Sequence, residues 1–266
     1  MYRKPLHAAL LLLLVATTAN AQVQDTINKK TPLFTGKDAL LIGVFAVGTA
    51  AVAPIDMQIA SRLQDSATQA NRFLHTAATG FRLLGDPGSI VTGSVIYLAG
   101  RVGGNARVQS LGLHSVESIV FADILSGVIK YAAGRQRPFV DIKNPHSFQF
   151  GRGLSDDKYR SFPSGHTTTA FAFASTVTRE SQFFWPHAGF LVGTIFYGGA
   201  SLVGISRIYN NMHWASDVMA GAAIGTIMGL HVVKYTHSHP DNAIDKLIKP
   251  KKSQIQVNPV LFSIKF

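Results

Sequence analysis

The sequence predicts an all-α protein, a bundle of about six helices. Six apolar stretches rich in glycine and alanine recur along the chain, at about 39–55, 88–100, 111–133, 166–178, 187–205 and 218–233. Their lengths and the scarcity of strand-type alternation are typical of helices. Between the first two, residues 55–75 carry apolar side chains at mixed helical spacing, which indicates one amphipathic helix.

Composition narrows the function classes. With 266 residues, the chain is long enough for one sizeable core. It contains no cysteine, so disulfides, thiolate metal sites and cysteine nucleophiles are excluded. The formal net charge is +11, from basic residues that are scattered apart from a cluster near the C-terminus. No nucleic-acid recognition motif accompanies this charge. An anionic substrate or an anionic membrane surface is therefore the expected partner, and nucleic acid is not.

The chain divides into four expected segments. Residues 1–21 resemble an export signal, with a charged start, an apolar run and the small-residue motif Ala19-Asn20-Ala21. An uncleaved membrane anchor is the alternative. Residues 22–37 are polar and are expected to be a linker, residues 38–236 the helical domain, and residues 237–266 a basic tail.

Membrane insertion is left open by the sequence. A helix that crosses a bilayer needs about 20 apolar residues, and only 187–205 approaches that length, while 39–55 and 218–233 are borderline. The stretch 111–133 contains four ionisable residues, which are costly when they face lipid. If the signal is cleaved, three full spans before residue 134 would place the loop 134–165 in the cytoplasm. The chain is thus either a soluble bundle or membrane-embedded with an incomplete set of spans, and we favour membrane association.

Three segments place polar residues at the ends of apolar helices. The first runs from Lys130 to Arg137-Pro138 at the end of one helix, where basic residues also complement the helix dipole. The second, Pro163-Ser164-Gly165-His166, reads either as an ordinary helix start or as an anion site at a helix N-terminus.

The third segment extends from Ser206-Arg207 to Asp217. If the last helix begins early, His213 and Asp217 share one face at i,i+4 spacing. Asp217 is then expected to accept the Nδ1 proton of His213, which leaves the other ring nitrogen free to attack. A capping aspartate beside an interfacial histidine is the simpler alternative.

Taken together, the three segments indicate a phosphate site. The loops 134–165 and 206–216 flank the helical hairpin 166–205, so both emerge on one side. Three cations, backbone N–H donors and two histidines suit a phosphoryl group and its developing charge. No acidic cluster suggests a metal, so neither metal nor cofactor is expected. The residues expected to converge are Lys130, Arg137, Ser164, His166, Arg207, His213 and Asp217.

These residues resemble the phosphatidic acid phosphatase type 2 superfamily, which is shared with bacterial class A acid phosphatases and vanadium haloperoxidases. The family signature K-x6-RP, PSGH and SR-x5-H-x3-D is matched in order at every fixed position, and the resemblance covers about residues 110–235. It implies a helical bundle that needs no metal. It also implies that His213 attacks phosphorus, that Asp217 orients it and that His166 protonates the leaving oxygen. Phosphate would be bound by Lys130, Arg137, Ser164, Gly165 and Arg207.

The expected activity is hydrolysis of phosphate monoesters or diphosphates of lipids, at the cell envelope with the site facing the periplasm, through a phosphohistidine. A soluble periplasmic acid phosphatase that acts on small phosphate esters is the main alternative. A vanadium-dependent haloperoxidase and a non-catalytic protein that kept the fold are weaker ones.

Overall fold

Helices account for the regular structure of the chain. A computed structural model describes residues 32, 34–239 and 242–244, and within these ranges there is no β-strand. The all-α expectation is confirmed. The helices are α2 (Gly36–Val52), α3 (Asp56–Leu63), α4 (Ser66–Gln69), α5 (Arg72–Leu83), α6 (Ser89–Val102), α7 (Ala106–Ala133), α8 (Gly165–Phe184), α9 (Gly189–Tyr209) and α10 (Ala215–Ser238). The signal-like segment 1–21, most of the expected linker and the basic tail beyond residue 244 lie outside the described residues.

The six apolar stretches correspond to α2 and α6–α10, each extended by a few residues. The expected amphipathic helix over 55–75 is wrong, because this stretch is divided into α3, α4 and α5. The side chain of Asp65 accepts a hydrogen bond from the backbone of Ala67, and that of Asn71 accepts from Phe73 and Leu74. Asp and Asn at these positions satisfy the free N–H groups of a new helix start, so each begins another helix.

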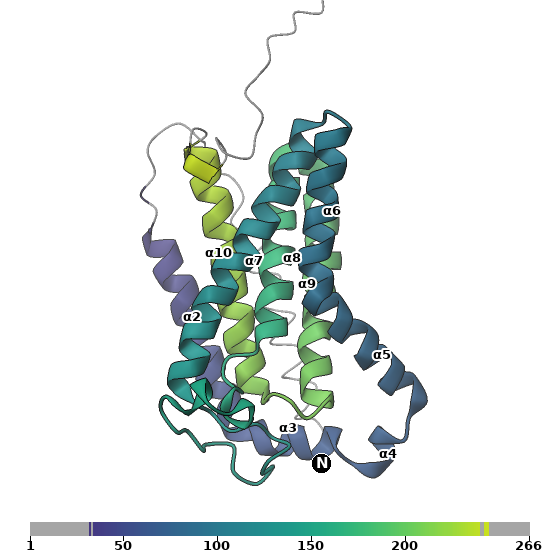
Figure 1. Ribbon diagram of the computed structural model, residues 1–266, viewed down its shortest axis with the longest axis vertical. Coiled ribbons are helices and arrows are strands. Elements are labelled where there is room, and N and C mark those ends of the chain that lie inside the picture. The colour runs from purple at the N-terminus through teal and green to yellow at the C-terminus, as the bar shows by residue number, and fades with distance from the viewer. Residues whose placement is uncertain (1–31, 33, 240–241, 245–266) are drawn as a thin grey trace, which may run out of the picture.

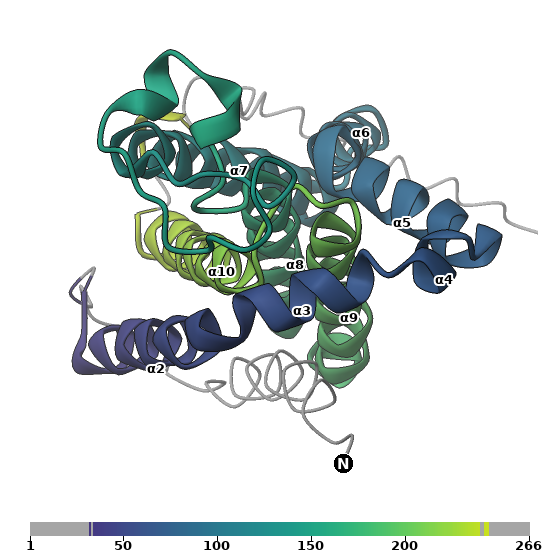
Figure 2. The ribbon, with the colours of Figure 1, turned by 90° about the horizontal axis from the view of Figure 1, so that it is seen from below.

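The long helices run along one axis, as Figure 1 shows, and alternate in direction from α7 to α10. The ends of α7 and α9 and the starts of α8 and α10 therefore meet at one end of the bundle, beside the loop 134–164. Seen from below in Figure 2, α3 lies across this same end. The long α8 is buried along most of its length, so it is the central helix of the bundle.

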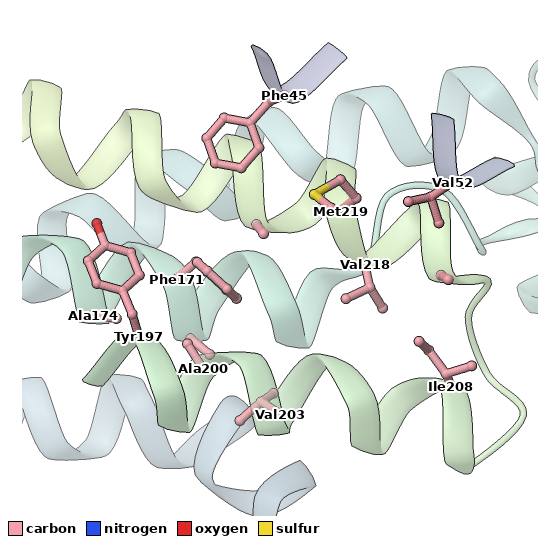
Figure 3. Packing of buried hydrophobic residues seen from close by; sticks show 13 residues of the cluster. Phe45, Val52, Phe171, Ala174, Tyr197, Ala200, Val203, Ile208, Val218 and Met219 are labelled. Atoms are coloured by element: carbon pink, nitrogen blue, oxygen red, sulfur yellow. The ribbon is translucent and has the colours of Figure 1, made fainter. Parts of the chain in front are cut away.

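The main core joins helices from both halves of the chain. In Figure 3, Phe45 and Val52 of α2 point toward Met219 of α10, while Phe171 of α8 lies near Tyr197 of α9. The rings of Phe171 and Tyr197 have centroids 5.9 Å apart at an interplanar angle of 60°. A second cluster, centred on Ile119 of α7, packs against the other side of α8.

A stripe of glycines lets α10 approach the backbone of α8. Gly221, Gly225 and Gly229 follow one another at i,i+4 spacing. A Cβ at Gly225 would lie 2.3 Å from the carbonyl oxygen of Thr168, and one at Gly221 would lie 2.6 Å from that of Ser164. Small residues at such spacing are the usual means by which helices pack closely within membranes.

Four segments are long and apolar enough to cross a membrane, namely 36–63, 106–133, 186–209 and 215–238. Large apolar side chains are exposed on the outward faces of the bundle, among them Val47 of α2, Val95 of α6, Ile124 of α7 and Phe190 of α9. A soluble protein seldom exposes so many. The fold therefore supports membrane association. The polar residues His114 and Glu117 of α7, which would be costly in lipid, are buried.

We predict that Gly225→Ala destabilises the protein. The added methyl group would meet backbone atoms of α8 that cannot move aside, and overpacking of this kind costs about 1–3 kcal/mol. For a chain of this size the apparent Tm should fall by roughly 3–10 °C, measured by thermal unfolding in detergent. Gly198→Ala in α9 is the matched control, because nothing lies within 4 Å of its added Cβ. Equal melting of the two variants would contradict the prediction.

Candidate active site

Lys130 reaches the site from the last turn of α7. Its Nζ donates to the carbonyl oxygen of Pro163 at 2.6 Å and to that of Arg160 at 3.2 Å, and lies 4.0 Å from the position of a Cβ on Gly165. The helix ends at Gly134, which adopts φ +56°. A Cβ there would collide with the carbonyl oxygen of Gln149, so only glycine fits this turn. The turn sends the chain back across the end of the bundle.

Arg137 and Arg207 differ in how their guanidinium groups are satisfied. Arg137 donates to Asp157, through Nε to the backbone oxygen at 2.9 Å and through Nη2 to the carboxylate at 3.0 Å. Arg207, in the last turn of α9, is only 4% exposed, yet its Nε and Nη1 have no hydrogen-bond partner among the described residues. A buried charge without a partner is costly. An anionic ligand would supply the missing acceptors.

The segment before α8 places the N-terminus of that helix among these cations. Ser164 is fully buried, and its hydroxyl accepts a hydrogen bond from Thr167 at 2.8 Å, so its own proton remains for another acceptor. The backbone N–H of Ser164 donates to the carbonyl oxygen of Asp217 at 3.0 Å, which fixes α8 against α10. Gly165 and His166 form the first turn of α8, where helical N–H groups are free to bind an anion.

His213 is held in a different way from the one the sequence indicated. Its Nδ1 lies 2.7 Å from the backbone oxygen of Ser161 and 3.8 Å from Oδ2 of Asp217. The second distance is too long for a hydrogen bond, so the expected hydrogen bond between His213 and Asp217 is absent, although the two groups remain within ion-pair distance. Ser161 stands between them, because its hydroxyl donates to Oδ2 of Asp217 at 2.5 Å while its carbonyl oxygen faces the histidine. Ser161 thus links Asp217 to His213 by one hydrogen bond to each.

The ring of His213 is neutral around pH 7. Burial lowers the pKa of this histidine to about 3, and the positive charges of Lys130 and Arg137 act in the same direction, while the carboxylate of Asp217 opposes them. With Nδ1 donating to the oxygen of Ser161, the unprotonated nitrogen is Nε2, which carries the lone pair. A neutral imidazole with its other nitrogen fixed in this way is suited to nucleophilic attack.

The carboxylate of Asp217 is part of a buried network that sequence reasoning missed. Arg135 donates to Oδ1 of Asp217 at 2.5 Å, to Oδ2 of Asp56 at 2.8 Å and to the hydroxyl of Ser216 at 2.7 Å. Asp56, at the start of α3, also accepts the backbone N–H of Ser216 at 2.8 Å. Asp56 and Asp217 are fully buried, and Arg135 is 2% exposed. Arg135 lies within the first motif, but Asp56 is far from all three motifs and no sequence pattern indicates its role.

The seven side chains that the sequence singled out are therefore brought to one end of the bundle. The charges of Lys130 and Arg137 lie near enough to interact with both His166 and His213, and that of Arg207 interacts with His166. Three cations and two imidazoles thus surround the N-terminus of α8. Such an arrangement can bind a phosphoryl group and stabilise charge that develops on its oxygens.

Comparison with known families agrees with this geometry. Residues 111–240, which contain all three motifs, match the PAP2 superfamily.

The match covers 130 of the 266 residues of the chain.

Proteins similar to this chain include enzymes named for lipid phosphates. The chain is 38% identical over 133 residues to the lipid A 1-phosphatase of Porphyromonas gingivalis. The aligned region covers 48% of this chain and 25% of that protein. It is 31% identical over 143 residues to the undecaprenyl-diphosphatase of Sulfolobus acidocaldarius, which covers 54% of this chain and 64% of that protein. The chain thus spans between a quarter and somewhat under two thirds of the length of these relatives.

A solved structure has a fold similar to that of this chain. The transmembrane PAP2 type phosphatidylglycerolphosphate phosphatase of Bacillus subtilis superposes with a TM-score of 0.58 at 23% sequence identity, covering 76% of this chain and 96% of that one. The match extends well beyond the motif region. Part of the chain before residue 111 therefore belongs to the shared fold.

We predict that Asp56→Asn destabilises the helical bundle at its active-site end. The change removes a charged hydrogen bond to Arg135, which is worth about 2–3 kcal/mol. The apparent Tm should fall by roughly 5 °C or more. The control is Asp65→Asn nearby, because Asp65 is exposed and Asn caps a helix equally well. If Asp56→Asn melts at the temperature of its control, the buried network does not contribute as described.

Proposed function

We propose that the chain hydrolyses phosphate monoesters or diphosphates through a phosphohistidine on His213. The observation that carries this proposal is the buried guanidinium of Arg207, whose Nε and Nη1 lack protein partners beside two histidines and two further cations. These two nitrogens are hydrogen-bond donors without an acceptor, and they lie where the oxygens of a phosphoryl group would bind. Lys130, Arg137, Ser164 and the N–H of Gly165 would complete the phosphate-binding set.

The reaction follows in two steps. Nε2 of His213 attacks phosphorus while the ester P–O bond breaks, and His166 donates a proton to the departing oxygen. Burial and the charge of Arg207 lower the pKa of His166 to about 3, so its ring is neutral without substrate. The negative charge of the bound phosphate raises this pKa and favours the protonated ring that the step requires. Water then attacks phosphorus as the P–N bond breaks, and His166 takes up the proton of that water. Phosphate leaves and both histidines return to their starting forms.

A lipid phosphate is the proposed substrate class. The outward faces of the bundle are apolar and four segments are long enough to cross a membrane. The relatives bear the names lipid A 1-phosphatase, undecaprenyl-diphosphatase and lipid phosphate phosphatase. A soluble acid phosphatase is less compatible with this surface, although one relative of 39% identity, from Zymomonas mobilis, is named acid phosphatase. A panel of lipid A, undecaprenyl diphosphate and phosphatidic acid, assayed beside p-nitrophenyl phosphate, would separate these classes by kcat/KM.

We predict that His213→Gln lowers kcat by at least about three orders of magnitude, as the loss of a nucleophile does. The variant should also fail to form the labelled phosphoenzyme that wild-type protein yields when quenched in alkali, which preserves the P–N bond. The control is His187→Gln, which changes an exposed histidine at the opposite end of the bundle. Near-normal turnover by His213→Gln would exclude the mechanism.

We also propose that the active site faces the periplasm. The start of α2 lies away from the site, toward the other end of α10, because Asp38 lies 3.5 Å from Lys234 (Figure 1). The site and the start of α2 therefore lie on opposite sides of a membrane that α2 crosses. A periplasmic site then requires Gly36 on the cytoplasmic side. A signal cleaved after Ala21 would instead deliver the chain before α2 to the periplasm. A labelling experiment that determines the orientation therefore also decides between a cleaved signal and a retained leader.

The absence of cysteine makes single-cysteine labelling direct. We predict that a membrane-impermeant maleimide labels Ser155→Cys, in the exposed active-site loop, in intact spheroplasts. It should label His187→Cys only after the membrane is permeabilised. The reverse pattern would place the site in the cytoplasm, and equal labelling of both before permeabilisation would contradict a membrane-spanning bundle.

A further inference from the structure

Three ionisable side chains meet inside the bundle, far from the active site. His114 of α7, Glu180 of α8 and His237 of α10 come from separate helices. His114 is 3% exposed and Glu180 is fully buried, while the side chain of His237 is 19% exposed. The phosphatase mechanism uses none of them. A carboxylate that is withdrawn from water in this way requires positively charged or hydrogen-bonding partners.

Both imidazoles direct a ring nitrogen at the same carboxylate. Nδ1 of His114 lies 2.5 Å from Oε1 of Glu180, and Nε2 of His237 lies 3.0 Å from each carboxylate oxygen. One ligand atom from each residue can be chosen so that all three lie within 4.8 Å of one another. The ring of His237 stacks on that of Phe183 with centroids 4.3 Å apart, which fixes its orientation. Three potential metal ligands are thus held around one point.

We propose that His114, Glu180 and His237 bind one transition-metal ion, with zinc as the best fit. Two imidazole nitrogens and one carboxylate oxygen form a ligand set that suits zinc, whereas calcium and magnesium prefer oxygen ligands alone. Three protein ligands leave a further coordination position for water. The partial exposure of His237 provides a route by which the ion can enter.

The spacing of the ligands is close to that which zinc requires. Bonds of about 2.0–2.1 Å in a tetrahedral site place the ligand atoms roughly 3.3–3.5 Å apart. The two 3.0 Å contacts of His237 are within a few tenths of this separation, and the contact of His114 must lengthen by about 1 Å. In the metal-free arrangement Nδ1 of His114 shares one proton with Glu180, and Nε2 of His237 shares one proton between the two carboxylate oxygens. The ion would replace these two protons.

The metal would act on the structure and not on phosphate. On α7, His114 precedes Lys130 by 16 residues, which corresponds to about 24 Å along the helix. On α10, His237 follows Asp217 by 20 residues, or about 30 Å. The ion would join α7, α8 and α10 at the end opposite the active site. The inference is therefore independent of the proposed phosphatase activity.

The test uses the full chain in detergent, with any polyhistidine tag removed. After treatment with a chelator and its removal, zinc is added in competition with a fluorescent chelator. We expect one zinc ion per chain, and an apparent Tm that rises when zinc is present. Cobalt in the same site should give the visible absorption of a four- or five-coordinate ion with nitrogen ligands.

Single substitutions assign the site. His237→Gln and Glu180→Gln should each raise the dissociation constant for zinc at least about tenfold and abolish the shift in Tm. His187→Gln and His213→Gln serve as controls that should leave zinc binding unchanged, the second because it alters the active site alone. His237→Gln carries the decision if Glu180→Gln does not fold, because its side chain is partly exposed. Gel filtration and the zinc-free melting curve verify that each variant is folded.

Two outcomes would overturn the inference. One is the absence of stoichiometric zinc binding by wild-type protein, which would leave the cluster as a hydrogen-bonded contact between helices. The other is zinc binding that persists unchanged in folded His237→Gln but is lost in His213→Gln, which would place the ion at the active site instead.

Discussion

The close approach of α10 to α8 is the contact on which the rest of the structure depends. It is possible only because glycine occupies every fourth position on the face of α10 that meets α8. At one end this contact places the carbonyl oxygen of Asp217 within hydrogen-bond distance of the N–H of Ser164. At the other end it brings His237 beside Glu180. Two polar clusters, one at each end, are thus built on a single line of backbone packing.

At the active-site end, the arginines differ in whether a carboxylate neutralises them. Arg135 is paired with two buried carboxylates and so serves to hold the loop, α3 and α10 together. Arg137 is paired with Asp157, whose side chain is 62% exposed. Arg207 alone among these arginines is buried with two unsatisfied nitrogens. The charges are therefore matched around Arg135 and unmatched at Arg207, where we propose that an anion binds.

Much of this could be predicted from the sequence, and the failures have physical causes. Long apolar stretches specified the six main helices, and the three motifs specified which helix ends meet. The division of 55–75 was missed because Asp65 and Asn71 act through their side chains as helix caps, an effect that apolar periodicity does not report. The place of Ser161 between His213 and Asp217 was missed because α10 begins at Ala215, so His213 lies before the helix and helical i,i+4 spacing does not apply to it. Asp56 was missed because its partner lies 79 residues away in the sequence.

Asp56 also determines how much of the chain before residue 111 a stable fragment must contain. The region that matches the family starts at residue 111, yet the carboxylate that neutralises Arg135 comes from α3, and the helix that leads to it packs on α10 through Phe45 and Val52. A fragment trimmed to the matched region would contain every motif residue and still leave a buried guanidinium short of one of its two counter-charges. An expression fragment or chimaera should therefore retain the chain from about Gly36 onward, because the catalytic half and the helices that precede it form one electrostatic unit.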